Sequence, residues 1–149
     1  MTQEDKRYFQ DKLCHARNRE LLLKDLCARL PYGVKIETPI DCWSRDTDVC
    51  ELKEIFKGDD GLFRIGDIGA LLEYSKPYLF PLSSMSEEQK KEYYSLVWFD
   101  GLSNGWNRDD AVILNEIEML IDFYHKNHLD WRGLIEKGLA IDATGLNIY

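Results

Sequence analysis

The segment Asp109–Lys126 reads DDAVILNEIEMLIDFYHK, and its apolar and polar residues repeat with the period of an α-helix. The apolar residues that fall on one side are Ile113, Ile117, Leu120, Ile121 and Tyr124. The polar residues that fall on the other side are Asn115, Glu118, Asp122 and Lys126. The pattern predicts a helix that buries its apolar stripe and serves as the spine of the fold.

Helical and extended segments are expected on both sides of this helix. Ser86 and Gln89 have the spacing of a capping box, which predicts a helix from there to about Val97. Tyr78–Leu82 is apolar but has a proline near each end, so we expect it to be extended and irregularly packed. Asp130–Gly138 favours one short helix that glycine closes.

The N-terminal segment is also expected to be helical. Phe9, Leu13 and Ala16 fall on one face, and further apolar residues follow up to Leu30. The pattern fits either one bent helix or two helices. Pro31 then ends the segment, because the residue before a proline is driven out of the helical region.

Three short stretches have the character of β-strands. Val34 and Ile36 alternate with charged residues, Val49–Phe56 is a second candidate, and Leu62–Ile65 can return antiparallel after a glycine-rich turn. Together with the helices, these strands predict an α+β fold. We expect residues 1–149 to form a single helix-rich domain with a small antiparallel sheet of about three strands.

Composition and charge restrict the class of function. The chain has 149 residues, of which 44% are hydrophobic, and a net charge of -8 from 19 basic and 27 acidic residues. Such a field repels nucleic acid and anionic membranes, so neither is an expected partner. No apolar run is long enough to span a membrane, and the first residues lack the apolar core of a secretion signal. We therefore expect a soluble, cytoplasmic protein.

A metal site is conceivable where the long helix ends. His125 and His128 are three residues apart, with Asp122 and Asp130 nearby, so a metal-dependent hydrolase is one alternative. A structural role is favoured, however, because the helix dipole already stabilises a histidine at this end. Asp122 can pair with Lys126, and two imidazoles do not complete a tetrahedral site. No cofactor is expected.

Aromatic and arginine side chains offer a second alternative. A protein that sequesters a nucleotide signal needs aromatic rings for stacking and guanidinium groups for phosphate. The candidates are Trp43, Arg45, Arg64, Trp106 and Arg108. Core packing is the favoured explanation for any one tryptophan in a chain of this size, and Trp106, beside glycine, is the one we expect to be exposed.

Three blocks of sequence resemble a group of known proteins. They are LCARLPYGVK at Leu26–Lys35, KPYLFPLSSMSEE at Lys76–Glu88 and DWRGLIEKGLA at Asp130–Ala140. In these blocks the chain is similar to uncharacterised small proteins of phages and of integrated elements in gut bacteria. The resemblance implies a phage-type product that acts in the cytoplasm of a bacterial host cell, with countering of host defence as one role. It implies no catalytic residue.

The favoured interpretation is non-catalytic binding. The chain has enough apolar residues for a stable core, but no motif that supplies a nucleophile, a base and oxyanion donors together. We therefore expect an accessory protein that binds a host or phage macromolecule, most simply a protein.

Overall fold

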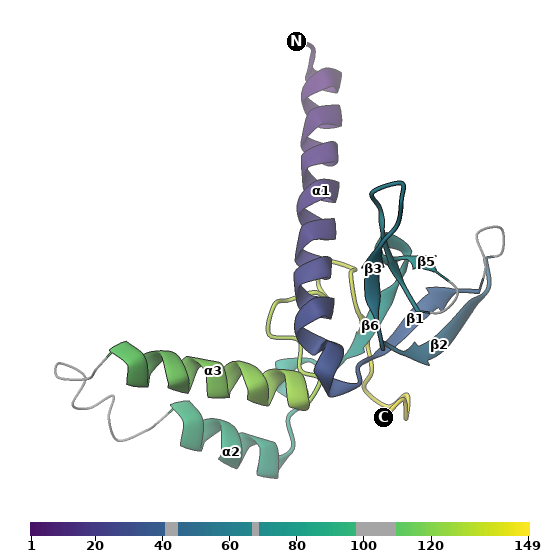
Figure 1. Ribbon diagram of the computed structural model, residues 1–149. Coiled ribbons are helices and arrows are strands. Elements are labelled where there is room, and N and C mark those ends of the chain that lie inside the picture. Colours follow the sequence, from purple (N-terminus) through teal and green to yellow (C-terminus); the bar gives the residue numbers. More distant parts are fainter. Residues whose placement is uncertain (41–44, 67–68, 98–109) are drawn as a thin grey trace.

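The computed structural model describes residues 1–40, 45–66, 69–97 and 110–149, with side chains in the last segment described from residue 115 onward. Its first element is α1 (Gln3–Arg29), one uninterrupted helix of 27 residues. Thr2 and Asp5 form a capping box at its start, with the Asp5 carboxylate accepting from Thr2 N at 2.8 Å and Thr2 Oγ1 accepting from Asp5 N at 3.1 Å. Of the two possibilities for this segment, the single helix is present, and its N-terminal half extends beyond the rest of the protein (Figure 1).

Within the described ranges, the remaining elements are two helices, three short 3-10 turns and seven strands. In chain order they are η1 (Leu30–Tyr32), β1 (Lys35–Pro39), β2 (Thr47–Glu51), β3 (Ile55–Lys57), β4 (Phe63–Ile65), β5 (Ala70–Leu71), η2 (Leu72–Tyr74), β6 (Lys76–Leu79), η3 (Leu82–Ser84), α2 (Glu87–Val97), α3 (Asp110–Lys126) and β7 (Ile141–Asp142). The α+β class predicted from the sequence is therefore confirmed. No helix among the described residues combines the length and the apolar character needed to cross a membrane.

The strands form two small sheets, where the sequence predicts one sheet of about three strands. One sheet has the order β2-β1-β6-β7, and the other has the order β3-β4-β5. All neighbours are antiparallel except β6 and β7, which are parallel. The antiparallel return at Leu62–Ile65 is confirmed as β4, which pairs with β3 and has Gly61 in the left-handed region at the turn. The predicted strand Val49–Phe56 is wrong as a single strand, because the structure divides it between β2 and β3, which belong to different sheets. Strand β6 lies inside its sheet, so Tyr78 and Leu79 are buried in a regular strand.

The hydrophobic core lies between the C-terminal half of α1 and the two sheets. Its fully buried members are Leu22, Leu26, Val34, Ile36, Leu52, Ile65, Leu72, Leu79, Leu134 and Ala140. The prediction that α3 is the spine of this core is wrong. Ile117 is 49% exposed, and from residue 115 onward the buried side chains of α3 are Phe123 and His125 in its last turns. Only this end of α3 lies against the body, whereas its start extends away from the body (Figure 1). The side chain of Ile113 lies outside the described residues.

Of the two helix predictions made from local sequence signals before and after α3, one is confirmed and one is wrong. The capping box before α2 is confirmed, because Gln89 N donates to Ser86 Oγ at 3.2 Å and Ser86 N donates to Gln89 Oε1 at 2.9 Å. The predicted short helix at Asp130–Gly138 is wrong, since this segment is a series of turns. Gly133 and Gly138 both adopt positive φ angles, which interrupt helical geometry.

Candidate binding surface

The exposed face of α1 carries a row of apolar side chains. Phe9, Leu13, Ala16 and Leu23 follow one another at spacings of four, three and seven residues, so they share one face of the helix. We call these four residues the docking strip. Phe9 is 56% exposed and Leu13 is 58% exposed, whereas Leu22 and Leu26, on the face that meets the sheets, are buried. Phe9 and Leu13 therefore point away from the core, whereas Leu23, at the C-terminal end of the docking strip, is half-buried and packs against the core.

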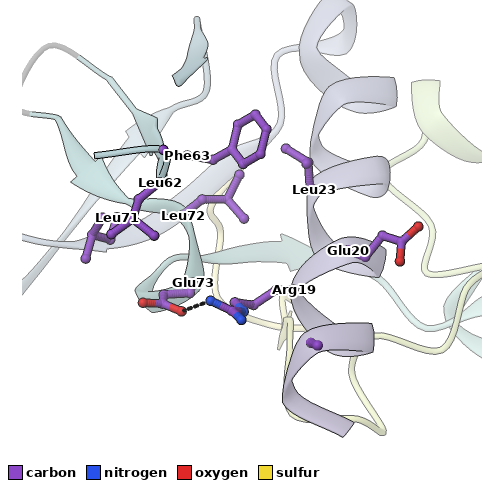
Figure 2. A pocket seen from close by; sticks show the side chains of 10 residues that line it. Arg19, Glu20, Leu23, Leu62, Phe63, Leu71, Leu72 and Glu73 are labelled. Atoms are coloured by element: carbon purple, nitrogen blue, oxygen red, sulfur yellow. Dashed lines mark hydrogen bonds and ion pairs between the residues drawn. The ribbon is translucent and has the colours of Figure 1, made fainter. Parts of the chain in front are cut away.

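The C-terminal end of the docking strip forms one wall of a groove of about 360 Å³. Ala16 and Leu23 line it from α1, and Leu62 and Phe63 line it from the β3–β4 hairpin. We call Leu62 and Phe63 the hairpin wall. Leu23 and Phe63 point toward one another across the groove (Figure 2). The apolar surface thus continues from the exposed half of α1 into a depression beside the second sheet.

An ion pair closes one end of this groove. Arg19 Nη1 lies 3.4 Å from Glu73 Oε2, which connects α1 to η2 (Figure 2). Both side chains keep substantial solvent access, so this contact adds at most about 1 kcal/mol to folding stability. Arg19, Glu73 and the nearby Glu20 are the charged residues in the otherwise apolar lining of the groove.

Basic residues border the docking strip on both sides. At 100° per residue, five basic residues and two acidic residues fall on or beside the strip's face of the helix. The basic residues are Lys6, Lys12, Arg17, Arg19 and Lys24, and the acidic residues are Asp5 and Glu20. This face is positive although the whole chain has a net charge of -8. The chain therefore separates a basic, apolar helix face from an acidic body.

A second polar cluster lies where α1 enters the body. Arg29 donates from Nε to Asp25 at 2.7 Å and from Nη2 to the Leu129 carbonyl at 2.7 Å. Arg132 Nε lies 3.3 Å from Asp25 Oδ1. The Asp25 and Arg29 side chains are fully buried, so these contacts fasten α1 to the C-terminal segment. The arrangement has the features of a structural clamp.

The two histidines of the candidate metal site occupy packed positions. His125 is buried, and its Nε2 accepts a hydrogen bond from Trp131 Nε1 at 3.1 Å. His128 stacks on Tyr149 with ring centroids 3.9 Å apart. Among the described residues, no three His, Cys, Asp or Glu side chains form a group that could hold a metal ion. One nitrogen of His125 is already engaged with protein.

Burial, with a further contribution from the positive charge of Arg29, lowers the pKa of His125 to about 4. Burial and the same arginine lower the pKa of His128 to about 4. Both imidazoles are therefore neutral at pH 7. A neutral His125 Nε2 is an acceptor, which matches the hydrogen bond that it receives from Trp131.

The candidate nucleotide ligands are only partly within the described structure. Trp43, Trp106 and Arg108 lie outside the described residues. Arg45 is exposed just before β2. Arg64 is held by its own hairpin, because it donates to Asp60 at 2.6 Å and to the Gly69 carbonyl at 3.0 Å. The Arg64 guanidinium thus fixes a local loop.

The docking strip and the hairpin wall are not recognisable as a site from the sequence alone. There, Phe9, Leu13 and Ala16 indicate only a helix. The basic residues beside that face are no signal of exposure, because the apolar stripe of a helix that enters a core is also bordered by charged residues. Leu62 and Phe63 gave no signal either, since exposed and core-facing apolar residues look alike in a short strand.

Comparison with family models, with curated proteins and with solved structures finds no match to this chain.

Proposed function

We propose that the protein acts without catalysis, by binding another protein through the docking strip and the groove. The observation that carries this proposal is the exposure of Phe9 and Leu13 on a helix that extends beyond the body (Figure 1). Large apolar side chains that are clustered on one exposed face, and not scattered, mark sites of interaction. The resemblance to proteins of phages and integrated elements supports a host or phage protein in the bacterial cytoplasm as the partner.

The energetics of burial support the same interpretation. Full burial of a Phe or Leu side chain is worth roughly 1.5–3 kcal/mol. In the free protein, Phe9 and Leu13 obtain little of this stabilisation, because more than half of each side chain remains in contact with water. A partner that covers both would gain the kind of central apolar contact that dominates protein interfaces.

The alternative functions receive less support. Of the candidate arginines for a nucleotide binder, Arg64 is engaged by Asp60 and Gly69, whereas Arg45 is exposed. A metal-dependent hydrolase would need ligands that converge, whereas His125 packs with Trp131 and His128 stacks on Tyr149. Neither alternative explains the apolar face of α1.

Comparative affinity capture from a bacterial lysate tests the proposal. The bait proteins are the wild type, Leu13→Glu in the docking strip, and Leu146→Glu as a matched control. Leu146 is 49% exposed and lies near the C-terminus, so the control places the same charge on a similarly exposed leucine elsewhere. We expect a protein that the wild type and Leu146→Glu retain and that Leu13→Glu loses.

A second experiment measures direct binding between the purified captured protein and the purified bait proteins. The captured protein should bind the wild type in calorimetry and should bind Leu13→Glu at least about 10-fold more weakly. Equal retention of every captured protein by the three baits would refute binding through α1.

A further inference from the structure

We infer that the docking strip receives an amphipathic α-helix with acidic flanks from the partner protein; this inference rests on the proposed function and specifies the chemistry of the partner. Three features of the described residues support it: the spacing of the docking strip, the groove at its C-terminal end, and the positive charge along its borders.

The spacing of the docking strip favours a helix as its occupant. Side chains at intervals of three and four residues form a ridge that packs into the grooves of another helix. From Phe9 to Leu23 the docking strip covers 14 residue steps, which is about 21 Å along α1. A partner helix of about four turns matches this length, whereas an extended strand would place side chains at a different repeat.

The groove adds a place for one anchoring side chain. Its volume of about 360 Å³ is in the range of pockets that bury small ligands, so it accommodates a Phe or Leu side chain with room to spare. Leu23 and Phe63 face one another across it and supply apolar contacts from both sides (Figure 2). A partner helix that lies along the docking strip in the same direction as α1 would insert an apolar residue of its last turn between them.

The charges select the flanks of the partner helix. Arg19 already pairs with Glu73, and Lys24 lies 3.9 Å from Glu20. Lys6 and Arg17, in contrast, form no ion pair with any residue that the structure describes. Glu or Asp residues beside the apolar stripe of the partner would meet these basic groups and steer the encounter.

The same charges disfavour a second copy of this chain as the occupant. Two docking strips packed face to face would bring together the basic borders of both copies, among them Lys12 and Arg17. Like charges across an interface suppress pairing, so self-association through α1 is opposed. We expect the protein to remain a monomer when no acidic helix is present.

Two fluorescent probe peptides test the inference. Each has about 16 residues, leucines at helical spacing and a phenylalanine in its last turn, and the two differ only in having Glu or Lys beside the apolar stripe. Anisotropy titrations with the full chain should show that the Glu probe binds at least about 10-fold more tightly than the Lys probe. Raising the salt concentration should reduce this preference.

Variants locate the probe on the surface. Leu13→Glu and Phe63→Ala should each weaken the Glu probe at least about 10-fold, whereas Leu146→Glu should leave its affinity unchanged. The double variant Lys12→Glu/Arg17→Glu should bind the Lys probe in preference to the Glu probe. Circular dichroism of each variant reports whether its helix content is retained, and Leu13→Glu, on an exposed face, is the variant least able to affect folding.

Several results would overturn the inference. They are absence of binding by the Glu probe, equal binding of the two probes, insensitivity to Leu13→Glu, and a dimer that Leu13→Glu dissociates. If a lysate protein still depends on Leu13 while the Glu probe fails to bind, only the acidic helix is refuted. If the lysate capture and the probe both fail, binding through α1 is refuted as well.

Discussion

Arg29 donates from Nε to the carboxylate of Asp25 at 2.7 Å, one turn earlier in α1, and neither side chain has any exposed surface. The pair holds α1 against the C-terminal segment, since the same guanidinium also reaches the Leu129 carbonyl. A buried ion pair of this kind contributes little beyond its own desolvation cost, but the removal of one partner leaves a charge without compensation. That asymmetry leads to the first prediction.

Arg29→Met should lower the free energy of unfolding by about 3–5 kcal/mol, because Asp25 would remain buried with only the 3.3 Å contact to Arg132. The double variant Asp25→Leu/Arg29→Met should be more stable than Arg29→Met alone. Urea denaturation followed by circular dichroism measures both values. A double variant that is less stable than Arg29→Met would show that the pair is not the source of the loss.

Acid should destabilise the fold through its buried histidines. The pKa of His125 and that of His128 are each about 4 in the folded protein, below the ordinary value of 6.5, because burial disfavours the charged imidazole. The depressed values favour folding fully above pH 6.5, and this contribution is lost as the pH falls toward 4, where the unfolded chain binds protons and the folded chain does not. The expected loss is on the order of 3 kcal/mol per histidine.

Urea denaturation at a series of pH values measures this slope. In the double variant His125→Gln/His128→Asn the slope between pH 6.5 and 4 should be much smaller. Gln can still accept from Trp131, and Asn tolerates the positive φ of 54° at position 128. Asp25, Arg29, Arg132 and Asp122 also influence His125 and remain in this variant. An unchanged slope would assign the acid sensitivity to carboxylates.

Asp130→Ala should destabilise the turns that follow α3. The Asp130 carboxylate accepts from Leu134 N at 2.8 Å and from Ile135 N at 2.9 Å, and Asp130 is itself buried. Its removal leaves two backbone donors without their acceptor, at a cost of about 2–4 kcal/mol. Thermal unfolding compared with Asp142→Ala provides the control, because Asp142 is exposed and accepts from one exposed backbone donor, Thr144 N. Similar losses in both variants would contradict this assignment.

The two halves of α1 should differ in stability. Amide groups before Ala16 should exchange with solvent faster than those from Leu22 to Arg29. The exposed half of α1 is not stabilised by packing against the core, and a helical segment without such packing is only marginally stable in water. Hydrogen exchange followed by mass spectrometry measures this difference. Addition of the Glu probe should slow exchange in the first half, and uniform protection along α1 in the free protein would contradict the prediction.

Sequence reasoning succeeded where the signal was local. Ser86 and Gln89 are three residues apart and cap α2 with their own side chains. This interaction involves only residues that are close in the sequence, so their spacing was enough to predict it. The α+β class and the β3–β4 hairpin were predictable for the same reason. Strand β7 was not predictable, because Ile141 pairs with Tyr78, which lies far away in the sequence.

The wrong predictions concern which apolar residues of the helices are buried. The periodicity of α3 is real, but periodicity does not say which turns reach the core, and Phe123 is buried while Ile117 is not. Phe9 and Leu13 likewise gave the correct helix without revealing that its face is uncovered. Exposure depends on where the rest of the chain ends up, and that information is not contained in a local pattern.

Helix α1 runs without a break from its exposed N-terminal end to the buried pair Asp25 and Arg29, so it is fixed to the rest of the protein only at its C-terminal end. A force that tilts or bends the helix near Phe9 also displaces Leu22 and Leu26, which the same helix contributes to the core. Binding of a partner at the N-terminal end would therefore change the packing of side chains about 20 Å away.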